Sequence, residues 1–390
     1  MKPKKYILPI IVFAQFACTS LWFAGNAIVD QIPILKDNGS EYIGHLLSSV
    51  QLGFIIGTLT FALLMIADRF SPSKVFLTCS FLAAACNTII LLPNLSITGI
   101  ILVRFGTGFF LAGIYPVGMK IAADYYEAGL GKALGYLVGA LVLGTAFPHF
   151  LNGINWSTNY SFITKGTSAL AVLGGLSLVI FVKDGPFRKP SQRLLLNATT
   201  NLFKIKQFKI AALGYFGHMW ELYAFWAFVP VAFQYYNKLH ESNESSPFVV
   251  FTIIAVGLLS CIIGGYIAIR KGSKKVAVIS LLISGICCLC SPLLFQLPYP
   301  VFLSVFVIWG MVVISDSPQF STLVAQAAAP ELKGTGLTIV NCIGFAISII
   351  SIQLLAYLSE HIEIKFLFIP LAIGPLFGLF YLLKKSPNKL

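Results

Sequence analysis

The sequence predicts an all-α integral membrane protein with 12 transmembrane helices in two repeated six-helix halves. Three observations lead to this fold class. Apolar residues fill 57% of the 390 positions and charged residues only 11%, against roughly 25% charged in an average soluble domain. Basic residues are concentrated in alternate loops, and the second half repeats features of the first at a constant offset. With a mean hydropathy of +0.86, the composition excludes a soluble enzyme, a disordered chain and a nucleic-acid-binding module.

Twelve apolar stretches are long enough to span a bilayer. A transmembrane helix needs roughly 20 mostly apolar residues, and clusters of Pro, Gly, Asn and charge divide the chain at that spacing. In the first half the stretches cover 6–29, 43–66, 75–93, 97–123, 132–154 and 163–182. In the second half they cover 209–236, 247–269, 276–296, 299–327, 335–357 and 363–383. They are too long and continuous for the strands of a membrane barrel, so we expect helices.

The basic residues predict the orientation, because Lys and Arg are retained on the cytoplasmic side of a membrane. With both termini inside, the inner segments hold 21 of the 27 basic residues, the outer loops hold four and span 4 holds two. The outer four are Lys36, Lys165, Lys238 and Lys365. We therefore expect a multi-pass protein of the cytoplasmic (inner) membrane with both termini cytoplasmic. Its positive charge sets the orientation in the lipid bilayer, and we expect no nucleic acid as a partner.

A long polar segment divides the chain into six spans and six spans. We expect a first bundle over 1–182, a cytoplasmic linker over 183–207 and a second bundle over 208–390. The linker is basic and could also rest on lipid headgroups. The N-terminus resembles a signal peptide, but its apolar run exceeds 20 residues and lacks a small-residue cleavage site, so we expect an uncleaved first span.

The two halves share features at an offset of 201 residues. The loop after span 2 reads ADRFSPSKV from Ala67, and the loop after span 8 reads AIRKGSKKV from Ala268. The same offset pairs Arg69 with Arg270, Lys74 with Lys275, Lys132 with Lys333, and Gly135 with Gly336. Internal repeats fix the architecture of a chain, so we expect two six-helix halves related by duplication.

These features resemble the major facilitator superfamily, whose members carry a G-x-x-x-D-R-x-G-R-K-like loop after spans 2 and 8. In the first copy the matching residues are Asp68, Arg69 and Lys74. In the second copy they are Gly265, Arg270, Gly272, Lys274 and Lys275, while Ile269 replaces the acid. In span 4, the residues that resemble a second family signature are Arg104, Gly108 and Ala112. The resemblance covers essentially the whole chain.

The resemblance implies two bundles around a central cavity that opens alternately to each side of the membrane. It implies that spans 1, 4, 7 and 10 line this cavity. It also implies that the loop motif acts as a cytoplasmic gate latch, carried here by Asp68 and Arg69, and that Ile269 weakens the latch of the second half. We expect a monomer that carries a small-molecule substrate and needs no cofactor or metal.

Polar residues inside the spans are the candidate site. An ionisable group there costs roughly 2.5–3.5 kcal/mol on insertion scales and usually faces a cavity or a partner. The deepest are Arg104 in span 4, Glu221 in span 7 and Asp316 in span 10. Helical spacing adds neighbours on the same faces of the spans, and in span 7 it places His218 on the face of Glu221. The full set of candidate pathway residues is Gln15, Trp22, Asn26, Arg104, Tyr115, His218, Glu221, Tyr223, Trp309, Asp316 and Gln319.

Each ionisable candidate has two interpretations. Glu221 either pairs with Arg104 in a buried structural bridge or accepts protons or substrate groups, as a carboxylate in a cavity can. Asp316 has the same alternatives, and His218 either relays protons or packs as a polar residue. Our hypothesis is that Glu221 and Asp316 take up and release the proton, while Arg104 orients the substrate or partners a carboxylate.

The aromatic candidates have alternatives as well. Trp22 and Asn26 either line the cavity or lie at the membrane interface, where aromatic and amide side chains are common. Pro318, next to the span 10 candidates, frees a backbone carbonyl and could kink the helix. We expect Trp22, Tyr223 and Trp309 to shape the cavity.

The motifs predict transport. The sequence contains no P-loop for ATP, no H-E-x-x-H, no G-x-S-x-G and no Cys/His cluster with zinc spacing. A cysteine cluster in span 9, Cys287, Cys288 and Cys290, could suggest a metal, but cysteine also packs helices as a small apolar residue, which we favour. We predict a secondary active transporter of a small solute, proton-coupled and acting by symport. A proton-coupled efflux antiporter and an intramembrane enzyme acting on lipid or peptide stay open.

Overall fold

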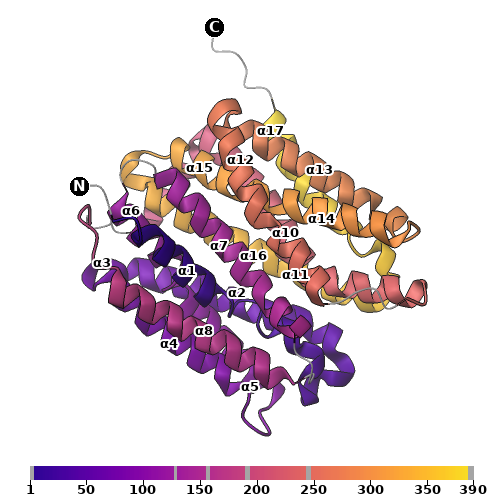
Figure 1. The fold of residues 1–390 in the computed structure, drawn as a ribbon. Coiled ribbons are helices and arrows are strands. Elements are labelled where there is room, and N and C mark those ends of the chain that lie inside the picture. The colour runs from indigo at the N-terminus through magenta and orange to yellow at the C-terminus, as the bar shows by residue number, and fades with distance from the viewer. Residues whose placement is uncertain (1–3, 127–129, 155–158, 189–193, 243–246, 385–390) are drawn as a thin grey trace.

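The computed structural model is all-helical and describes residues 4–126, 130–154, 159–188, 194–242 and 247–384. Its helices form two bundles that lie side by side (Figure 1). The first contains α1 (Ile7–Thr19), α2 (Gly39–Leu63), α3 (Ile66–Arg69), α4 (Pro72–Ile89), α5 (Ile97–Leu111), α6 (Tyr115–Tyr125), α7 (Leu130–Ile154) and α8 (Tyr160–Phe181). The second contains α10 (Lys206–Leu239), α11 (Pro247–Ala255), α12 (Gly257–Lys271), α13 (Ser273–Leu294), α14 (Tyr299–Ser315), α15 (Ser317–Ala327), α16 (Lys333–His361) and α17 (Ile373–Leu383). The linker contributes the short helix α9 (Thr199–Lys204), and residues 189–193 of it lie outside the described ranges.

Each of the 12 expected spans contains at least one α-helix. In the part of the chain that the structure describes, nine spans are long and apolar enough to cross a membrane by length and composition. The remaining three expected spans are α1, α4 and α10. Helix α1 is only 13 residues long, because the first span ends its α-helix at Thr19, and α4 and α10 include polar residues such as Asn87 and Glu221.

Spans 4 and 10 are broken at corresponding places of the two bundles. Span 4 consists of α5 and α6, and Pro116 lies in the first turn of α6. Span 10 consists of α14 and α15, and Pro318 lies in the first turn of α15. Proline has no N–H and is tolerated at the start of a helix but not in its interior. The break beside Pro318 confirms the kink expected there.

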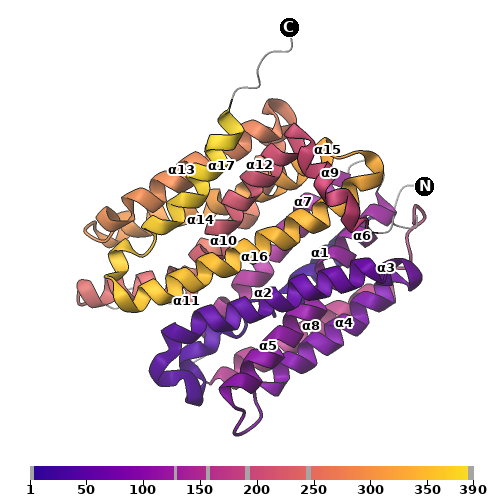
Figure 2. The same cartoon turned by 180° about the vertical axis from the view of Figure 1, so that it is seen from behind.

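The bundles meet along two symmetry-related seams. Helix α2 packs against α16, and α7 packs against α11 and α12, so each seam joins the second span of one half to the fifth span of the other (Figure 2). Small residues allow close approach in such seams. A Cβ built on Gly44 of α2 would lie 2.8 Å from the Cβ of Ala356 in α16.

Glycines also bring helices together inside the first bundle, where α2 crosses α5. A Cβ built on Gly108 would lie 1.9 Å from the carbonyl oxygen of Val50, and one built on Gly53 would lie 2.0 Å from that of Phe105. Backbone cannot move aside as a flexible side chain can, so only glycine fits here. This contact explains why the second signature of span 4 contains Gly108.

Alanine at Gly108 is expected to lower the thermal stability of the protein in detergent, because its methyl group would overlap the Val50 carbonyl and overpacking costs about 1–3 kcal/mol. The control is Gly265→Ala in α12, where a Cβ meets nothing within 4 Å and alanine favours the helix by roughly 0.5–1 kcal/mol. Equal melting temperatures for the two variants would contradict this packing.

Candidate functional site

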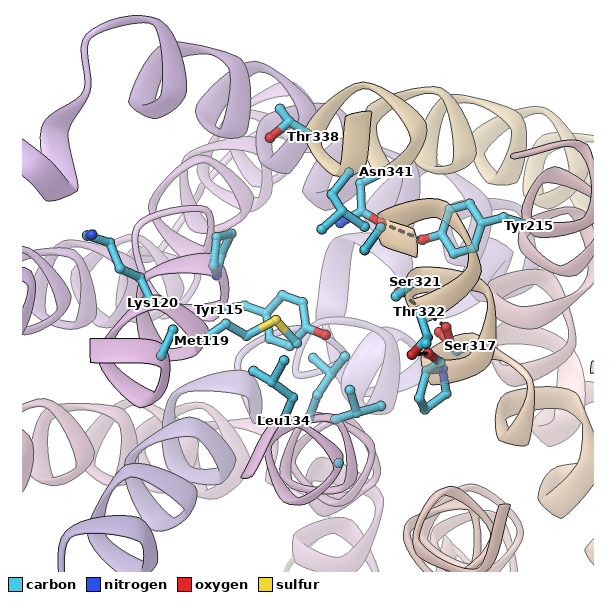
Figure 3. A pocket seen from close by; sticks show the side chains of 18 of the residues that line it. Tyr115, Met119, Lys120, Leu134, Tyr215, Ser317, Ser321, Thr322, Thr338 and Asn341 are labelled. Carbon is cyan, nitrogen blue, oxygen red and sulfur yellow. Dashed lines mark hydrogen bonds between the residues drawn. The ribbon is translucent and has the colours of Figure 1, made fainter. Parts of the chain in front are cut away.

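A cavity of about 1200 Å³ lies between the two bundles. Helices α2, α6 and α7 line one side, and α10, α12, α15 and α16 line the other (Figure 3). The lining extends to Asp68 of α3 and Ser273 at the start of α13. The cavity therefore reaches the face that carries α3 and the α12–α13 turn, where α1 also begins and α17 ends (Figure 1).

Aromatic side chains from both bundles form the floor of the cavity. Trp22 stacks on Tyr223 with ring centroids 5.9 Å apart. Phe345 of α16 packs on both, at 5.7 Å from Trp22 and 5.3 Å from Tyr223, and all three rings are buried. Such pairs contribute roughly 0.5–1.5 kcal/mol beyond the area they bury. The floor is thus the place where the first span, α10 and α16 touch across the molecule.

Beyond the floor, hydrogen bonds close the seam between α2 and α16. The hydroxyl of Ser348 donates to Oε1 of Gln51 over 2.8 Å. One and a half turns further, Nε2 of Gln353 donates to the hydroxyl of Ser48 over 2.9 Å. The cavity therefore opens to one side of the molecule and is sealed on the other.

Glu221 lies behind the cavity wall, inside the second bundle. The indole N–H of Trp309 donates to Oε1 of Glu221 over 2.7 Å, the thiol of Cys288 donates over 3.3 Å, and the hydroxyl of Ser284 also donates. The carboxylate is 1% exposed. It ties α10 to α13 and α14, and its hydrogen bonds come from neutral groups.

Asp316 forms the second buried acidic site, at the break between α14 and α15. Its Oδ1 lies 2.8 Å from Nδ1 of His218 in α10, and both residues are 1% exposed. The pair is an ion pair when the imidazole is protonated. His218 and Glu221 therefore share the face of α10 that the spacing predicted, and that face packs against α13–α15 and not against the cavity.

Arg104 is also fully buried, in the first bundle. Its Nη2 donates to the backbone carbonyls of Leu21 over 3.0 Å and Trp22 over 2.6 Å, and its Nη1 donates to Oδ1 of Asn87 over 3.2 Å. The first span leaves the α-helix after Thr19, which frees these carbonyls from helical donors. Gly25 leaves room for the guanidinium, since a Cβ there would lie 2.8 Å from its Nε.

The alternative in which Arg104 pairs with Glu221 is wrong. The two side chains have different partners in different bundles, and the ion pairs among the described residues include neither. The separation follows from the fold, because spans 4 and 7 belong to opposite bundles.

Other candidates take various positions. Four of them line the cavity: Trp22, Tyr115, Tyr223 and Gln319. Gln15 is buried beside Gly118 in the first bundle. Asn26 donates to the Ile43 carbonyl over 3.0 Å, and the indole of Trp309 donates to Glu221 as described above. Cavity residues that the sequence analysis did not select include Thr338 and Asn341 of α16. The sequence signal for them is that two polar residues stand three positions apart, and so on one helix face, in an otherwise apolar span.

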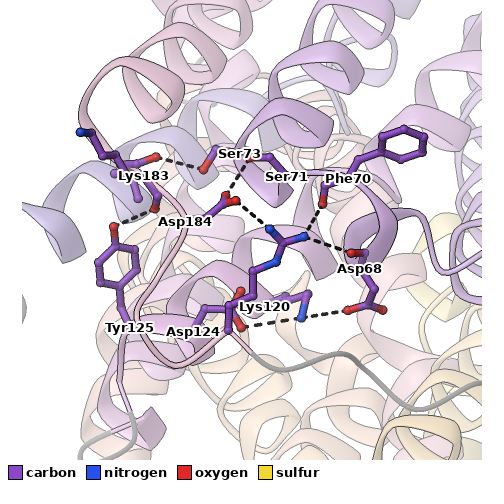
Figure 4. Close-up of polar contacts among 11 residues, drawn as sticks. Asp68, Phe70, Ser71, Ser73, Lys120, Asp124, Tyr125, Lys183 and Asp184 are labelled. Carbon is purple, nitrogen blue, oxygen red and sulfur yellow. Dashed lines mark hydrogen bonds and ion pairs between the residues drawn. The ribbon is translucent and has the colours of Figure 1, made fainter.

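At the open face, Asp68 anchors a network of charges (Figure 4). Nζ of Lys120 lies 3.1 Å from Asp68 Oδ1 and 3.7 Å from Asp124 Oδ1. Arg188 of the linker pairs with Asp184 at 2.7 Å and donates to the backbone carbonyls of Asp68 over 3.0 Å and Phe70 over 2.8 Å. The network holds the first part of the linker on the first bundle.

The basic residues of the two gate motifs lie outside this network of charges. Arg69, Lys74, Arg270 and Lys275 are exposed, and none of them takes part in the ion pairs among the described residues. Gly265 lines the cavity. In this structure the carboxylate of Asp68 is thus paired with Lys120 of its own bundle. The guanidinium that bonds to the backbone of Asp68 and Phe70 belongs to Arg188 of the linker and not to Arg69.

Two repeated helical bundles around a cavity sealed at one end are the arrangement typical of secondary transporters. The family model of the Major Facilitator Superfamily matches residues 11–352, so the chain belongs to this family. Its members transport small solutes and are not enzymes, which excludes the intramembrane enzyme.

A solved structure supports the fold. The chain superposes on the structure of the proton:xylose symporter XylE bound to 6-bromo-6-deoxy-D-glucose with a TM-score of 0.71 and 13% sequence identity, over 98% of this chain and 95% of that chain. At this identity the likeness shows the fold alone. Among curated protein sequences no match is found.

Replacing Arg104 by Met is expected to lower the melting temperature strongly, because each buried carbonyl left without a donor costs about 1–3 kcal/mol. Arg104→Lys should be intermediate, since an ammonium lacks the planar fork. The control is Arg270→Met at an exposed position, which should melt like the parent. If Arg104→Met melted normally and lost only solute binding, the capping role would be wrong.

Proposed function

We propose that the protein is a proton-coupled symporter that carries a small solute into the cell by alternating access. The sealed floor between two bundles supports this proposal most directly. A solute in the cavity contacts both bundles, so closing the open face around it would pull the seams of the other face apart. The sugar symporter that shares the fold is consistent with this mode.

We propose Glu221 and Asp316 as the proton sites. Both are carboxylates deep in the membrane, where ionisable residues typically mark ion pathways. Glu221 of α10 is bonded from α13 and α14, and Asp316 between α14 and α15 pairs with His218 of α10. Gain or loss of a proton at either carboxylate therefore changes how α10 is held by its neighbours. Glu221 receives hydrogen bonds from three neutral donors, and Asp316 faces His218, itself a proton acceptor. Neither carboxylate lines the cavity, so coupling to the solute acts through the packing of α10, whose Tyr223 lies in the floor.

The same proposal includes the orientation of the protein in the membrane and the two bundles that move relative to each other. The excess of Lys and Arg on the side of the termini favours both termini in the cytoplasm and the cytoplasmic membrane as the location. The cavity would then be open to the cytoplasm. The moving bundles would be residues 1–182 and 208–390, connected by 183–207.

The test of the proton sites uses Glu221→Gln and Asp316→Asn in sealed liposomes with an internal pH dye and a panel of solutes. Both variants keep an oxygen for the same donors but cannot release a proton. Solute-dependent proton movement should fall at least about tenfold, while exchange of labelled solute without a gradient should persist.

The matched control is Glu360→Gln, an exposed carboxylate at the end of α16, which should leave both measurements unchanged. Normal proton movement by both variants at every pH would refute the assignment. Solute moving against the proton flow would support the efflux antiporter instead of the symporter.

A further inference from the structure

The two walls of the cavity differ in chemistry. The wall formed by the first bundle is mainly apolar, with Met119, Leu134, Val138 and Leu141. The facing wall on α15 and α16 carries neutral polar groups, among them Ser317, Ser321, Thr322, Thr338 and Asn341. Figure 3 shows Met119 and Leu134 across the cavity from Asn341, Ser321 and Thr322. Apart from the phenols of Tyr115 and Tyr136, the neutral polar groups of the middle of the cavity are therefore concentrated on α15 and α16, where they alternate with apolar residues such as Ala325 and Leu337.

Charge is confined to the open end of the cavity. Among the described residues that line it, only Asp68, Lys120 and Lys333 are charged. The first two lie 3.1 Å apart, and Lys333 starts α16 at the same face. The deep ionisable residues Arg104, Glu221 and Asp316 lie outside the lining. A charged solute would lose its hydration without gaining a counter-ion, which costs several kcal/mol.

Two buried polar atoms at the inner end of the cavity lack partners within the described residues. They are the indole N–H of Trp22 and the hydroxyl of Thr58, and both residues belong to the lining. Buried polar groups are nearly always hydrogen-bonded. Both atoms are covered by neighbouring side chains in this structure, so a solute at the floor would reach them only when those side chains move. Once reached, both suit neutral acceptors such as carbonyl or hydroxyl oxygens.

We infer that the cavity binds an uncharged amphipathic solute, with its apolar face on α6 and α7 and its hydroxyl, carbonyl or amide groups toward α15 and α16. The inference rests on the proposed function, because it assigns the solute class to the same cavity. A polyol that is polar all round fits poorly, since the first wall is mainly apolar and offers few hydrogen-bond partners besides Tyr115 and Tyr136, and either sign of charge is disfavoured at depth.

The test measures binding to the purified full chain with two matched sets of probes. One set contains N-acetylphenylalaninamide, the anion N-acetylphenylalanine and the cation phenylalaninamide. The other contains phenyl β-D-glucoside, the anion phenyl β-D-glucuronide and glucose. The uncharged amphipathic member of at least one set should bind about 10-fold tighter than the other two. Tighter binding of a charged member or of glucose, or no binding by either uncharged amphipathic probe, would overturn the inference.

Single hydroxyl deletions locate the bound solute. Thr322→Val and Thr338→Val should each weaken binding of the responding probe by about 3- to 10-fold, as expected for a neutral hydrogen bond. The controls are Thr60→Val and Thr252→Val, outside the lining. Thr60 donates to the carbonyl four residues earlier over 2.8 Å, as Thr322 does over 2.9 Å. Equal effects of cavity and control variants would overturn the assigned wall.

The inferred solute class and the proposed symport can be refuted independently of each other. If an uncharged amphipathic probe binds but never crosses a liposome membrane, the solute class stands and the proposed symport fails. If a charged solute is carried with protons, the symport stands and the solute class is overturned.

Discussion

The structure depends on the way Arg104 caps the broken end of the first span. Backbone groups in a membrane must be satisfied within the protein, so a span can leave the α-helix at mid-depth only where donors replace the lost helical bonds. Arg104 supplies them to the carbonyls of Leu21 and Trp22. The segment after Thr19 can then turn its indole toward the other bundle, where Trp22 meets Tyr223 and Phe345. Arg104 therefore stabilises the floor of the cavity, although its own side chain does not line the cavity.

The second bundle uses its buried charges differently. Glu221 and Asp316 attach one face of α10 to α13–α15, and Tyr223, two residues beyond Glu221, extends from α10 to the floor. One helix therefore connects two carboxylates to the contact between the bundles. This arrangement gives protonation a route to the cavity through packing, since packed helices shift between discrete arrangements and do not deform continuously.

Much of this architecture could be predicted from the sequence, because bilayer thickness fixes span length and the 201-residue offset reveals the repeat. The break of span 10 followed from Pro318, and the shared face of His218 and Glu221 followed from their spacing. Spacing along a helix defines a face but not the neighbour that covers it, so the same pattern could not tell a cavity from the interior of a bundle. Arg104 was recognised as deep, but its backbone partners arise from a helix break at Thr19 that no Pro or Gly marks.

The central claim is that the two bundles alternate, so that one face closes as the other opens, and two distances test it most directly. Spin labels at positions 69 and 270 report the open face, and labels at 36 and 360 report the sealed face, all at exposed sites. The eight native cysteines are buried or partly buried and should be replaced first. In lipid nanodiscs, changing pH or adding a binding solute should shorten the first distance and lengthen the second together. Changes of both distances in the same direction, or one fixed distribution at each face under all conditions, would contradict the claim.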